Sequence, residues 1–194
     1  MTNNMEQFIH IHKTFEKVIY QDRKINNREF DGCTFLNCDF SNSDFSYNVF
    51  IDCVFIDCNM GNMQLAASSL KTVTFTNCKL LGIEFGKCED FLFNVSFDNC
   101  ILDYASFANK KMAKTKFLNN SMRDVIFTGT NLSEAVFDNS NLEGAVFTDS
   151  ILKKAVFTTA HNYKIDPEAN DIRLARFSNE GLSGLLYKYD IKIV

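Results

Sequence analysis

The chain has 194 residues, 46% of them hydrophobic, and is therefore long enough to bury a sizeable core within one domain. Its formal net charge of −4 is unlike the clustered positive charge of proteins that hold nucleic acid, so we expect protein partners and no direct nucleic-acid binding. No basic region followed by an apolar stretch opens the chain, and no apolar run approaches the roughly 18 residues that span a bilayer, so the sequence predicts a cytoplasmic protein without membrane contact.

The first segment, residues 1–19, precedes the regular part of the sequence. Its apolar residues are compatible with a short helix that caps the structure that follows. They are Phe8, Ile11, Phe15, Val18 and Ile19.

Residues 20–160 carry a large apolar residue at every fifth position. Near the end of this segment the series runs Leu132, Phe137, Leu142, Phe147, Leu152 and Phe157. Neither the 3.6-residue period of a helix nor the two-residue period of a strand gives this spacing. A unit of five residues cannot enclose a core alone, so successive units must turn corners and form stacked coils. With four units in each coil, residues separated by twenty lie on the same face.

Residues separated by twenty do resemble one another, as stacked coils require. Phenylalanine fills two opposite faces, and leucine or methionine fills the other two. The predicted core stack has Phe97, Phe117, Phe137 and Phe157 in one column and Phe107, Phe127 and Phe147 in the opposite one. The sequence therefore predicts an all-β solenoid with a square cross-section.

The five-residue register shifts once, at residues 86–91. The next strong centre is Leu92, seven residues after the last one. This segment must therefore contain a two-residue insertion, which we expect to form a small loop at a corner. Glu89 and Asp90 are its candidate exposed residues, and Phe91 either contacts a partner or packs against the coil.

The seven cysteines are an odd number, which without a secretory signal indicates reduced thiols. Six of them stand two residues before a large apolar residue of the series, a position that we call the slot: Cys33, Cys38, Cys53, Cys58, Cys78 and Cys100. Elsewhere alanine, serine, threonine or valine fills the slot, which favours a small core residue. Structural zinc ligands usually stand two to four residues apart, whereas these pairs are five apart, so we predict no metal.

Catalytic chemistry has no recognisable residue set in this sequence. The three histidines, His10, His12 and His161, do not combine with carboxylates or cysteines in the pattern of a metal site or a catalytic triad. No glycine-rich phosphate loop is present. We therefore predict no enzyme, no catalytic residue and no cofactor.

Residues 161–194 break the repeat and are predicted to form a C-terminal cap. Ser178 is placed to cap a short helix, and the last residues are compatible with a small strand. The apolar residues of this segment fall on one helix face and the final strand: Leu182, Leu185, Leu186, Tyr189, Ile191 and Ile193. They can seal the last coil, or seal it and also pack against a second copy in a homodimer.

The repeated patterns A-(V/L)-F-x-x and S-N-L-x-x resemble the pentapeptide repeat family. This resemblance implies a right-handed quadrilateral β-helix over roughly residues 20–160. The tail, with NYKID, NDIRLARFS and YDIKI, resembles the gyrase-interacting branch, which includes albicidin-resistance, microcin-immunity and quinolone-resistance proteins. The resemblance implies a bacterial protein that dimerises through its tail, with an acidic rod that imitates DNA and engages DNA gyrase.

The charge distribution bears on this implied imitation of DNA. Residues 30–91 carry eight acidic side chains against three lysines, a net charge of −5, whereas residues 92–157 are balanced. In the balanced half, residues of opposite charge stack in two ladders. The alternative interpretation is that these charges are ordinary solvated surface. The ladders are Lys114, Glu134, Lys154 and Asp103, Arg123, Glu143.

Any phosphate-like surface must therefore lie on the first coils and the 86–91 loop. The predicted partner-binding residues are Asp52, Asp57, Glu89 and Asp90. One hypothesis is that the chain engages DNA gyrase, a type II topoisomerase, by partial DNA mimicry and protects it from an antibiotic or toxin. The alternative is a structural scaffold for another cytosolic protein, with no effect on gyrase.

Overall fold

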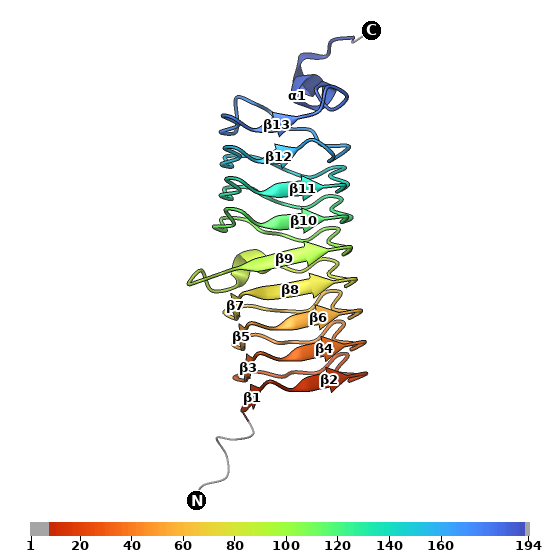
Figure 1. Cartoon of the computed structure of the whole chain (residues 1–194), viewed down its shortest axis with the longest axis vertical. Coiled ribbons are helices and arrows are strands. Elements are labelled where there is room, and N and C mark those ends of the chain that lie inside the picture. The colour runs from red at the N-terminus through yellow and green to blue at the C-terminus, as the bar shows by residue number, and fades with distance from the viewer. Residues whose placement is uncertain (1–7, 193–194) are drawn as a thin grey trace, which may run out of the picture.

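The computed structural model describes residues 8–192, which form a stack of coils whose strands pair in parallel (Figure 1). A shorter sheet contains β1 (Ile9–Ile11), β3 (Glu29–Asp31), β5 (Val49–Ile51) and β7 (Ser69–Lys71). A longer sheet runs the height of the stack, with β2 (Thr14–Glu16), β4 (Thr34–Leu36), β6 (Val54–Ile56), β8 (Val73–Thr76), β9 (Val95–Asp98), β10 (Lys116–Leu118), β11 (Val136–Asp138), β12 (Val156–Phe157) and β13 (Arg176–Phe177). The predicted all-β solenoid is confirmed.

The register between coils is the predicted one. Phe35 pairs with Phe55, and Phe117 pairs with Phe137, a separation of twenty residues in each case. Between β8 and β9 the separation rises by two, because Phe75 pairs with Phe97. The predicted two-residue insertion is therefore present, and it follows a short 3-10 helix, η1 (Phe85–Lys87).

The phenylalanine columns form the centre of the core, and all seven residues of the predicted core stack are buried. Within a column the rings stack, as for Phe117 and Phe137, whose centroids are 4.9 Å apart with planes 7° from parallel. Between opposite columns the rings meet edge to face, as for Phe117 and Phe127 at 5.8 Å and 78°. Both arrangements suit the charge distribution of aromatic rings.

Most slots hold small side chains, and the polar ones among them bond to the coil below. Cys53 Sγ donates to the carbonyl of Phe30 at 3.3 Å, and Ser150 Oγ donates to that of Phe127 at 2.7 Å. Burial, opposed by a backbone hydrogen bond, raises the pKa of Cys53 to about 12, so its thiol stays protonated. Among residues 8–192 no group of three or more His, Cys, Asp or Glu side chains is placed to hold a metal ion.

The corners are made by residues in the left-handed backbone region, where asparagine and aspartate are more favourable than most residues. One corner carries Asp57, Asn77, Asn99, Asn119 and Asn139, all with φ between 49° and 58°. Their side chains form vertical hydrogen bonds: Asn77 Nδ2 donates to Asp57 at 3.0 Å, and Asn99 Nδ2 donates to Asn77 at 2.8 Å. The corner residues thus connect coils as well as turn the chain.

The predicted N-terminal capping helix is wrong for residues 8–19. β1 and β2 lie there instead and pair with β3 and β4 as part of the first coil. The reason is that His10 and Phe15 continue the five-residue spacing and stack on Phe30 and Phe35. Residues 1–7 of the predicted cap lie outside the described residues.

The solenoid also continues beyond the predicted boundary at residue 160. β13 pairs with β12, and Phe177 stacks on Phe157 at 5.2 Å. The helix that follows is short, with α1 at Ser183–Leu186 and a 3-10 turn, η2, at Tyr187–Tyr189. Ile191 is not in a strand, whereas Ile193 and Val194 lie outside the described residues.

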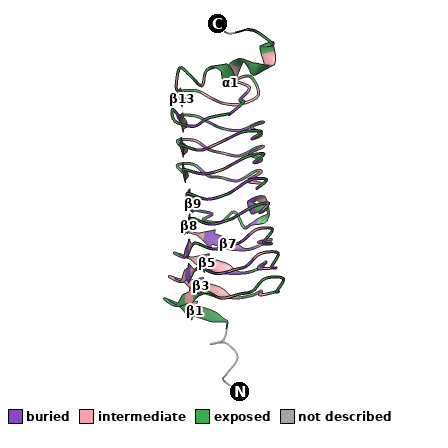
Figure 2. Cartoon of the chain, turned by 90° about the vertical axis from the view of Figure 1, so that its right-hand side faces the viewer, coloured by how far each residue is buried: buried purple, intermediate pink, exposed green. Residues whose placement is uncertain are grey.

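Buried and exposed residues alternate along each coil. Figure 2 shows β1 and the segment around α1 mostly in the colour of exposed residues, whereas buried residues recur along every coil between them. No helix among residues 8–192 is long and apolar enough to cross a membrane.

Candidate protein-interaction surfaces

The predicted partner-binding residues Asp52 and Asp57 are exposed and occupy corners at the two ends of β6, with φ of 49° and 53°. Asp52 lies two coils below the end of the inserted loop. Its corner precedes β6, and the equivalent corners of the next two coils precede β8 and β9, which pair with each other. Asp57 lies at the other end of the same face, at the base of the asparagine ladder. The two carboxylates therefore do not form one cluster.

Glu89 and Asp90 lie in the inserted loop, as predicted, but their environments differ. The Glu89 side chain is exposed, and its backbone N–H donates to the carbonyl of Ser68 at 2.9 Å. Asp90 forms an ion pair with Lys110, whose Nζ lies 2.6 Å from its Oδ1. Lys110 is only 1% exposed, whereas Asp90 is 71% exposed. Part of the charge of Asp90 is thus neutralised within the protein.

Lys110 was not among the residues singled out from the sequence. It occupies a slot, where every neighbouring coil has a small or uncharged residue. Its ammonium group also bonds to the carbonyl of Cys88 and lies 5.0 Å from the centroid of the Phe93 ring. The sequence did contain a sign of this ion pair, because it places a lysine at a slot, which is a buried position. Long charged side chains are almost never fully buried unless they are paired.

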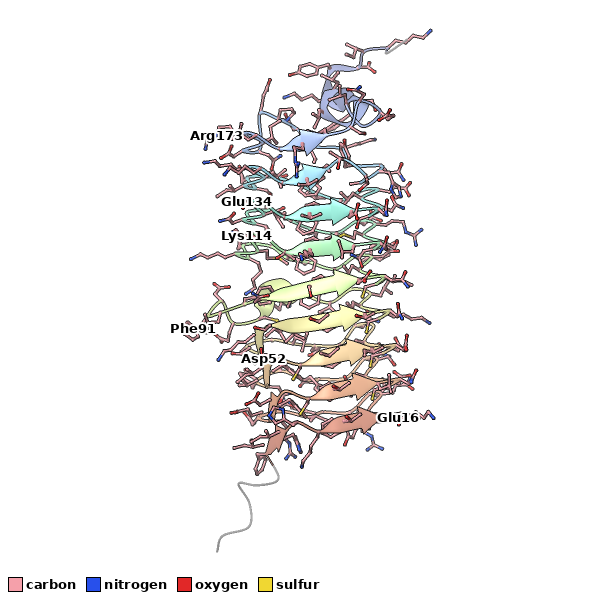
Figure 3. All side chains as sticks on the ribbon, viewed as in Figure 1. Glu16, Asp52, Phe91, Lys114, Glu134 and Arg173 are labelled. Atoms are coloured by element: carbon pink, nitrogen blue, oxygen red, sulfur yellow. The ribbon has the colours of Figure 1, made fainter. Side chains whose placement is uncertain are left out.

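The tip of the loop is apolar. Phe91 is 71% exposed, with Nζ of Lys71 5.6 Å from its ring centroid, so it does not pack into the coil. Figure 3 shows its side chain projecting from the edge of the solenoid. Leu92, which the spacing places inside the core, is 62% exposed, and Phe93 is buried instead. The larger apolar ring takes the inner position, where it also contacts Lys110.

The acidic residues of 30–91 do not form a vertical row. Asp44 pairs with Lys24 at 3.0 Å, and Glu84 pairs with Lys87 at 2.7 Å. Burial would raise the pKa of Asp44, but hydrogen bonds from Ser46 and the ion pair with Lys24 outweigh it and lower this pKa to about 2. The acidic half is therefore partly neutralised by its own lysines, and its remaining carboxylates are spread over the strand β3, a bridge at Asp39, two corners and the inserted loop.

In the balanced half, one of the predicted charge ladders contains a close ion pair. Arg123 Nη2 lies 2.6 Å from Asp103 Oδ2, and Ser121 Oγ donates to the same carboxylate at 2.6 Å. Burial would raise the pKa of Asp103, but these hydrogen bonds lower it below its usual value. Lys114 and Glu134 share an exposed corner, along the edge that Figure 3 labels.

The C-terminal helix rests directly on the last coil. A Cβ at Gly181 would lie 1.9 Å from the Tyr163 hydroxyl oxygen, and one at Gly184 would lie 2.2 Å from the Tyr163 carbonyl oxygen. At Gly184 the neighbour is backbone, so only glycine permits this approach. Ser178 Oγ accepts a hydrogen bond from the Gly181 N–H at 3.2 Å, which fixes the turn before α1, although Leu182 and not Ser178 is the residue preceding the helix.

Lys188 ties the end of the helix to the loop around Pro167. Its Nζ lies 2.7 Å from Asp166 and 2.6 Å from Glu168, while the Tyr189 hydroxyl donates to Glu168 at 3.0 Å. Hydrogen bonds with Lys188 lower the pKa of both carboxylates. The cap is thus held in one orientation on the solenoid.

This orientation leaves apolar side chains in solvent. Of the predicted dimer residues, Leu185 packs against the core, whereas Leu182, Leu186, Tyr189 and Ile191 are exposed. Leu174, at a corner of the last coil, is 71% exposed and was not predicted. The sequence analysis did not identify Leu174 as a corner residue, because residues 161–194 were predicted to break the repeat.

Comparisons with known proteins point to one family. A family model described as a pentapeptide repeat region matches residues 28–107, and one described as pentapeptide repeats (8 copies) matches residues 126–161. Together these two matches cover more than half of the chain. No curated protein matches it.

Among solved structures, full-length QnrB1, a plasmid-mediated fluoroquinolone resistance protein, is similar with a TM-score of 0.64 and 17% identity over 92% of this chain and 100% of that one. A trypsin-treated variant of QnrB1 gives a TM-score of 0.60 and 19% identity, over 96% of this chain and 98% of that one. At these identities the likeness establishes the fold alone. The chain belongs to the pentapeptide repeat family, and its solenoid resembles the quinolone-resistance branch of that family.

Proposed function

We propose that this protein is a non-enzymatic binding protein that engages DNA gyrase and protects it from an antibiotic or toxin. The observation that carries the proposal is the structural likeness to QnrB1, which extends over nearly the whole of both chains. Proteins of this fold present side chains on a rigid rod, which suits recognition of another macromolecule. A cytoplasmic location follows, since gyrase acts on the bacterial chromosome.

The charge distribution favours contact through selected residues over imitation of DNA along the whole rod. Asp52, Asp57 and Glu89 are exposed, and Asp52 lies below the loop that carries Glu89. Phe91 and Leu92 add apolar surface beside these charges. Partial mimicry through the acidic half is therefore the form of the proposal that the geometry supports best.

Dimerisation through the C-terminal cap is part of the same proposal. The exposed residues Leu174, Leu182, Leu186 and Tyr189 belong to the last coil and the helix that rests on it. Two copies joined by this surface would bury apolar area, the main favourable contribution to association. The acidic halves would then lie at the two outer ends of the dimer.

A supercoiling assay with purified gyrase and a fluoroquinolone tests the function. We expect micromolar protein to restore supercoiling that the drug inhibits, and the triple variant D52K, D57K, E89K to lose this effect while keeping its fold. Glu134→Lys, a charge reversal at an exposed corner of the balanced half, is the matched control. Unchanged drug sensitivity with the wild-type protein would reject gyrase as the partner.

The alternative function, a scaffold for another cytosolic protein, is favoured by one observation. Asp44, Glu84 and Asp90 are paired with lysines of the same chain, which reduces the free negative charge that DNA mimicry would rely on. Affinity purification from the source cell distinguishes the two: enrichment of a different protein without gyrase subunits would support the scaffold.

A further inference from the structure

The inserted loop opens a groove in the side of the solenoid. Figure 1 shows this loop projecting beside the start of β9. Residues 93–96 line the groove on the loop side and residues 111–116 line it on the next coil, with a volume of about 400 Å³. The two stretches do not pair along their whole length, because β9 and β10 are in register only from Phe97 and Phe117 onward.

Three backbone groups on the wall formed by residues 111–116 have no hydrogen-bond partner. One coil further on, the equivalent groups are bonded: the Asn131 N–H donates to the carbonyl of Lys110 at 2.8 Å, and the Asn131 carbonyl accepts from the Met112 N–H at 2.7 Å. Within the described part of the chain, no such bond reaches the N–H of Lys111, its carbonyl or the carbonyl of Ala113. The insertion thus leaves a short strand edge in the side of the rod, and such an edge can pair with another chain.

The loop does not satisfy this edge, because its own backbone bonds elsewhere. The Asn94 N–H donates to the carbonyl of Leu70, on the coil below, at 2.9 Å. The Cys88 carbonyl accepts from the ammonium group of Lys110, which is a side chain and not a backbone N–H. These bonds fix the loop beside the edge and leave the edge itself unpaired.

The same wall of the groove carries positive charge. The stretch KKMAKTK, residues 110–116, contains four lysines and no acidic residue. The first of these lysines is buried and paired, whereas Lys111, Lys114 and Lys116 are exposed and line the groove. None of these three forms an ion pair with any residue that the structure describes. A ligand in the groove therefore meets three unpaired cations, on a protein whose net charge is −4.

The loop side of the groove is apolar. Phe93 and Val95 form its buried wall. Phe91 and Leu92, at the tip of the loop, are 71% and 62% exposed, and Figure 3 labels Phe91 and Lys114 along the same edge of the molecule. A segment that suits this groove therefore has both acidic and apolar side chains, which alternate on the two faces of an extended chain.

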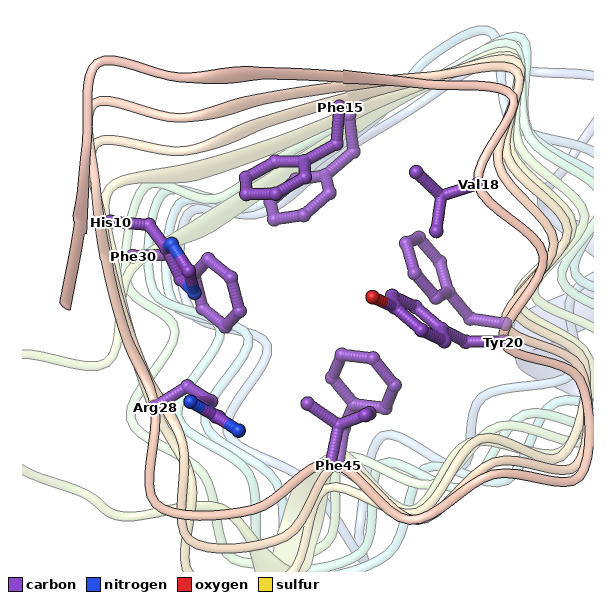
Figure 4. Close-up of a pocket in the computed structure, with 10 residues that line it drawn as sticks. His10, Phe15, Val18, Tyr20, Arg28, Phe30 and Phe45 are labelled. Atoms are coloured by element: carbon purple, nitrogen blue, oxygen red, sulfur yellow. The ribbon is translucent and has the colours of Figure 1, made fainter. Parts of the chain in front are cut away.

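The N-terminal end of the solenoid also has strand edges without a neighbouring strand among the described residues, at β1 and β2. The cavity between them, of about 270 Å³, is lined mainly by rings, among them His10, Phe15 and Tyr20 (Figure 4). Its arginine, Arg28, lies over the ring of Phe8, with Cζ 4.4 Å from the ring centroid. The described lining of that cavity thus offers no unpaired cation, whereas the groove beside the loop offers three.

We propose that the groove beside the inserted loop binds an extended, acidic segment of another protein. The segment adds a strand that pairs with the N–H of Lys111 and with the carbonyls of Lys111 and Ala113. Its carboxylates meet Lys111, Lys114 and Lys116, and an apolar side chain contacts Phe91.

Other occupants fit the groove less well. A nucleic acid has the anionic charge but lacks the amide groups that pair with a strand edge. A second copy that docked groove to groove would bring the two sets of lysines together. The carboxylates proposed to contact gyrase have the opposite charge, so the groove is a separate surface and its test does not involve gyrase.

Fluorescence anisotropy with the full-length protein tests the proposal. The probe is a labelled peptide of alternating glutamate and valine. Its controls are a peptide of alternating lysine and valine, and the acidic peptide with methylated backbone amides. We expect saturable binding of the unmodified acidic peptide only, weakened by salt and reduced at least about tenfold by Lys114→Glu combined with Lys116→Glu. Hydrogen exchange at the Lys111 amide, which has no partner in the free protein, should slow by at least about tenfold when the peptide binds.

Lys154→Glu is the matched control, because this exposed corner belongs to the same column as Lys114 but lies two coils away; it should leave the affinity unchanged. Lys111→Glu repeats the test if the double variant does not fold. Equal binding of the lysine peptide or of the methylated peptide, preferred binding of a single-stranded oligonucleotide, or protection at β1 and β2 in place of Lys111 would overturn the proposal. A dimer that the double variant dissociates would also overturn it, because the groove would then belong to a second copy.

Discussion

Phenylalanine side chains in the core columns have contacts of two kinds, and both follow from the spacing of five residues. Rings in the middle of a column stack on rings of the coils above and below and meet the opposite column edge to face. Phe137 has all of these neighbours and is fully buried. Its contribution to stability therefore comes from burial and from ring geometry together.

Phe137→Ala should lower the free energy of unfolding by about 3–5 kcal/mol, because it removes a buried aromatic ring and leaves a cavity. Lys154→Ala, at an exposed corner, should change it by less than about 0.5 kcal/mol. Urea unfolding followed by circular dichroism measures both. A Phe137→Ala protein as stable as the wild type would mean that the ring is not part of a packed column.

The ion-paired carboxylates make the free energy of unfolding depend on pH. The pKa of Asp44 is lowered to about 2, from an ordinary value of 3.8, so this group stabilises the fold fully above about pH 4. Its contribution is lost as the pH falls from about 4 to 2, because the unfolded chain then binds the proton more strongly. Asp44→Asn should therefore show a smaller fall in melting temperature over this range than the wild type. Identical slopes for the two proteins would contradict this expectation.

The inserted loop is the element whose position was predicted but whose internal arrangement was not. The spacing located the insertion because it changes the register of every later residue. It placed Leu92 at the inner position, five residues before Phe97, whereas the structure buries the adjacent Phe93 and leaves Leu92 exposed. Phe93 also lies near Lys110, whose Nζ is 5.0 Å from its ring centroid, and the spacing gives no sign of this contact.

Asp90 was predicted to bind a partner protein, but in the structure it forms an ion pair with Lys110. The two residues are twenty apart in the chain, and only the stacking of coils brings them together. The N-terminal segment was misread for a different reason. The spacing of its apolar residues fits a helix face, while His10, the inward residue of its first coil, is polar and hides the five-residue pattern.

Lys110→Met should release the loop while keeping most of the side-chain volume. We expect amide exchange at residues 89–94 to accelerate by about tenfold, as for the loss of a hydrogen-bonded ion pair worth about 1–2 kcal/mol. Lys111→Met, at the exposed neighbouring position, is the matched control. If both variants exchange at the wild-type rate, Lys110 does not hold the loop.

At the scale of the whole molecule, each coil contacts mainly the coils next to it, so stability accumulates along the rod. The sequence predicted this architecture well because one rule, the likeness of residues twenty apart, applies to most of the chain. Both boundaries were wrong because the repeat extends further at each end, where β1 and β2 pair with β3 and β4, and β13 pairs with β12. The cap after β13 depends on contacts such as that of Gly184 with Tyr163, which no repeat encodes.

Deleting residues 117–136 should remove one complete coil and leave every other column in register, because Phe117 and Phe137 occupy equivalent positions. We expect a shorter protein that still unfolds cooperatively, with a lower melting temperature. Deleting residues 117–134 should instead turn the inward residues of the following coils away from the core. Comparable folding of the two deletions, measured by circular dichroism, would contradict the twenty-residue coil.

The seven free cysteines are all buried, and all lie between residues 33 and 100. No thiol in the intact rod should react with a water-soluble thiol reagent, and each should become reactive only when its own coil opens. Mass spectrometry of the labelled peptides would thus report the order in which the N-terminal coils come apart. The second half of the rod, without a cysteine beyond Cys100, would remain unlabelled throughout, so the protein contains a built-in reporter of fraying from one end.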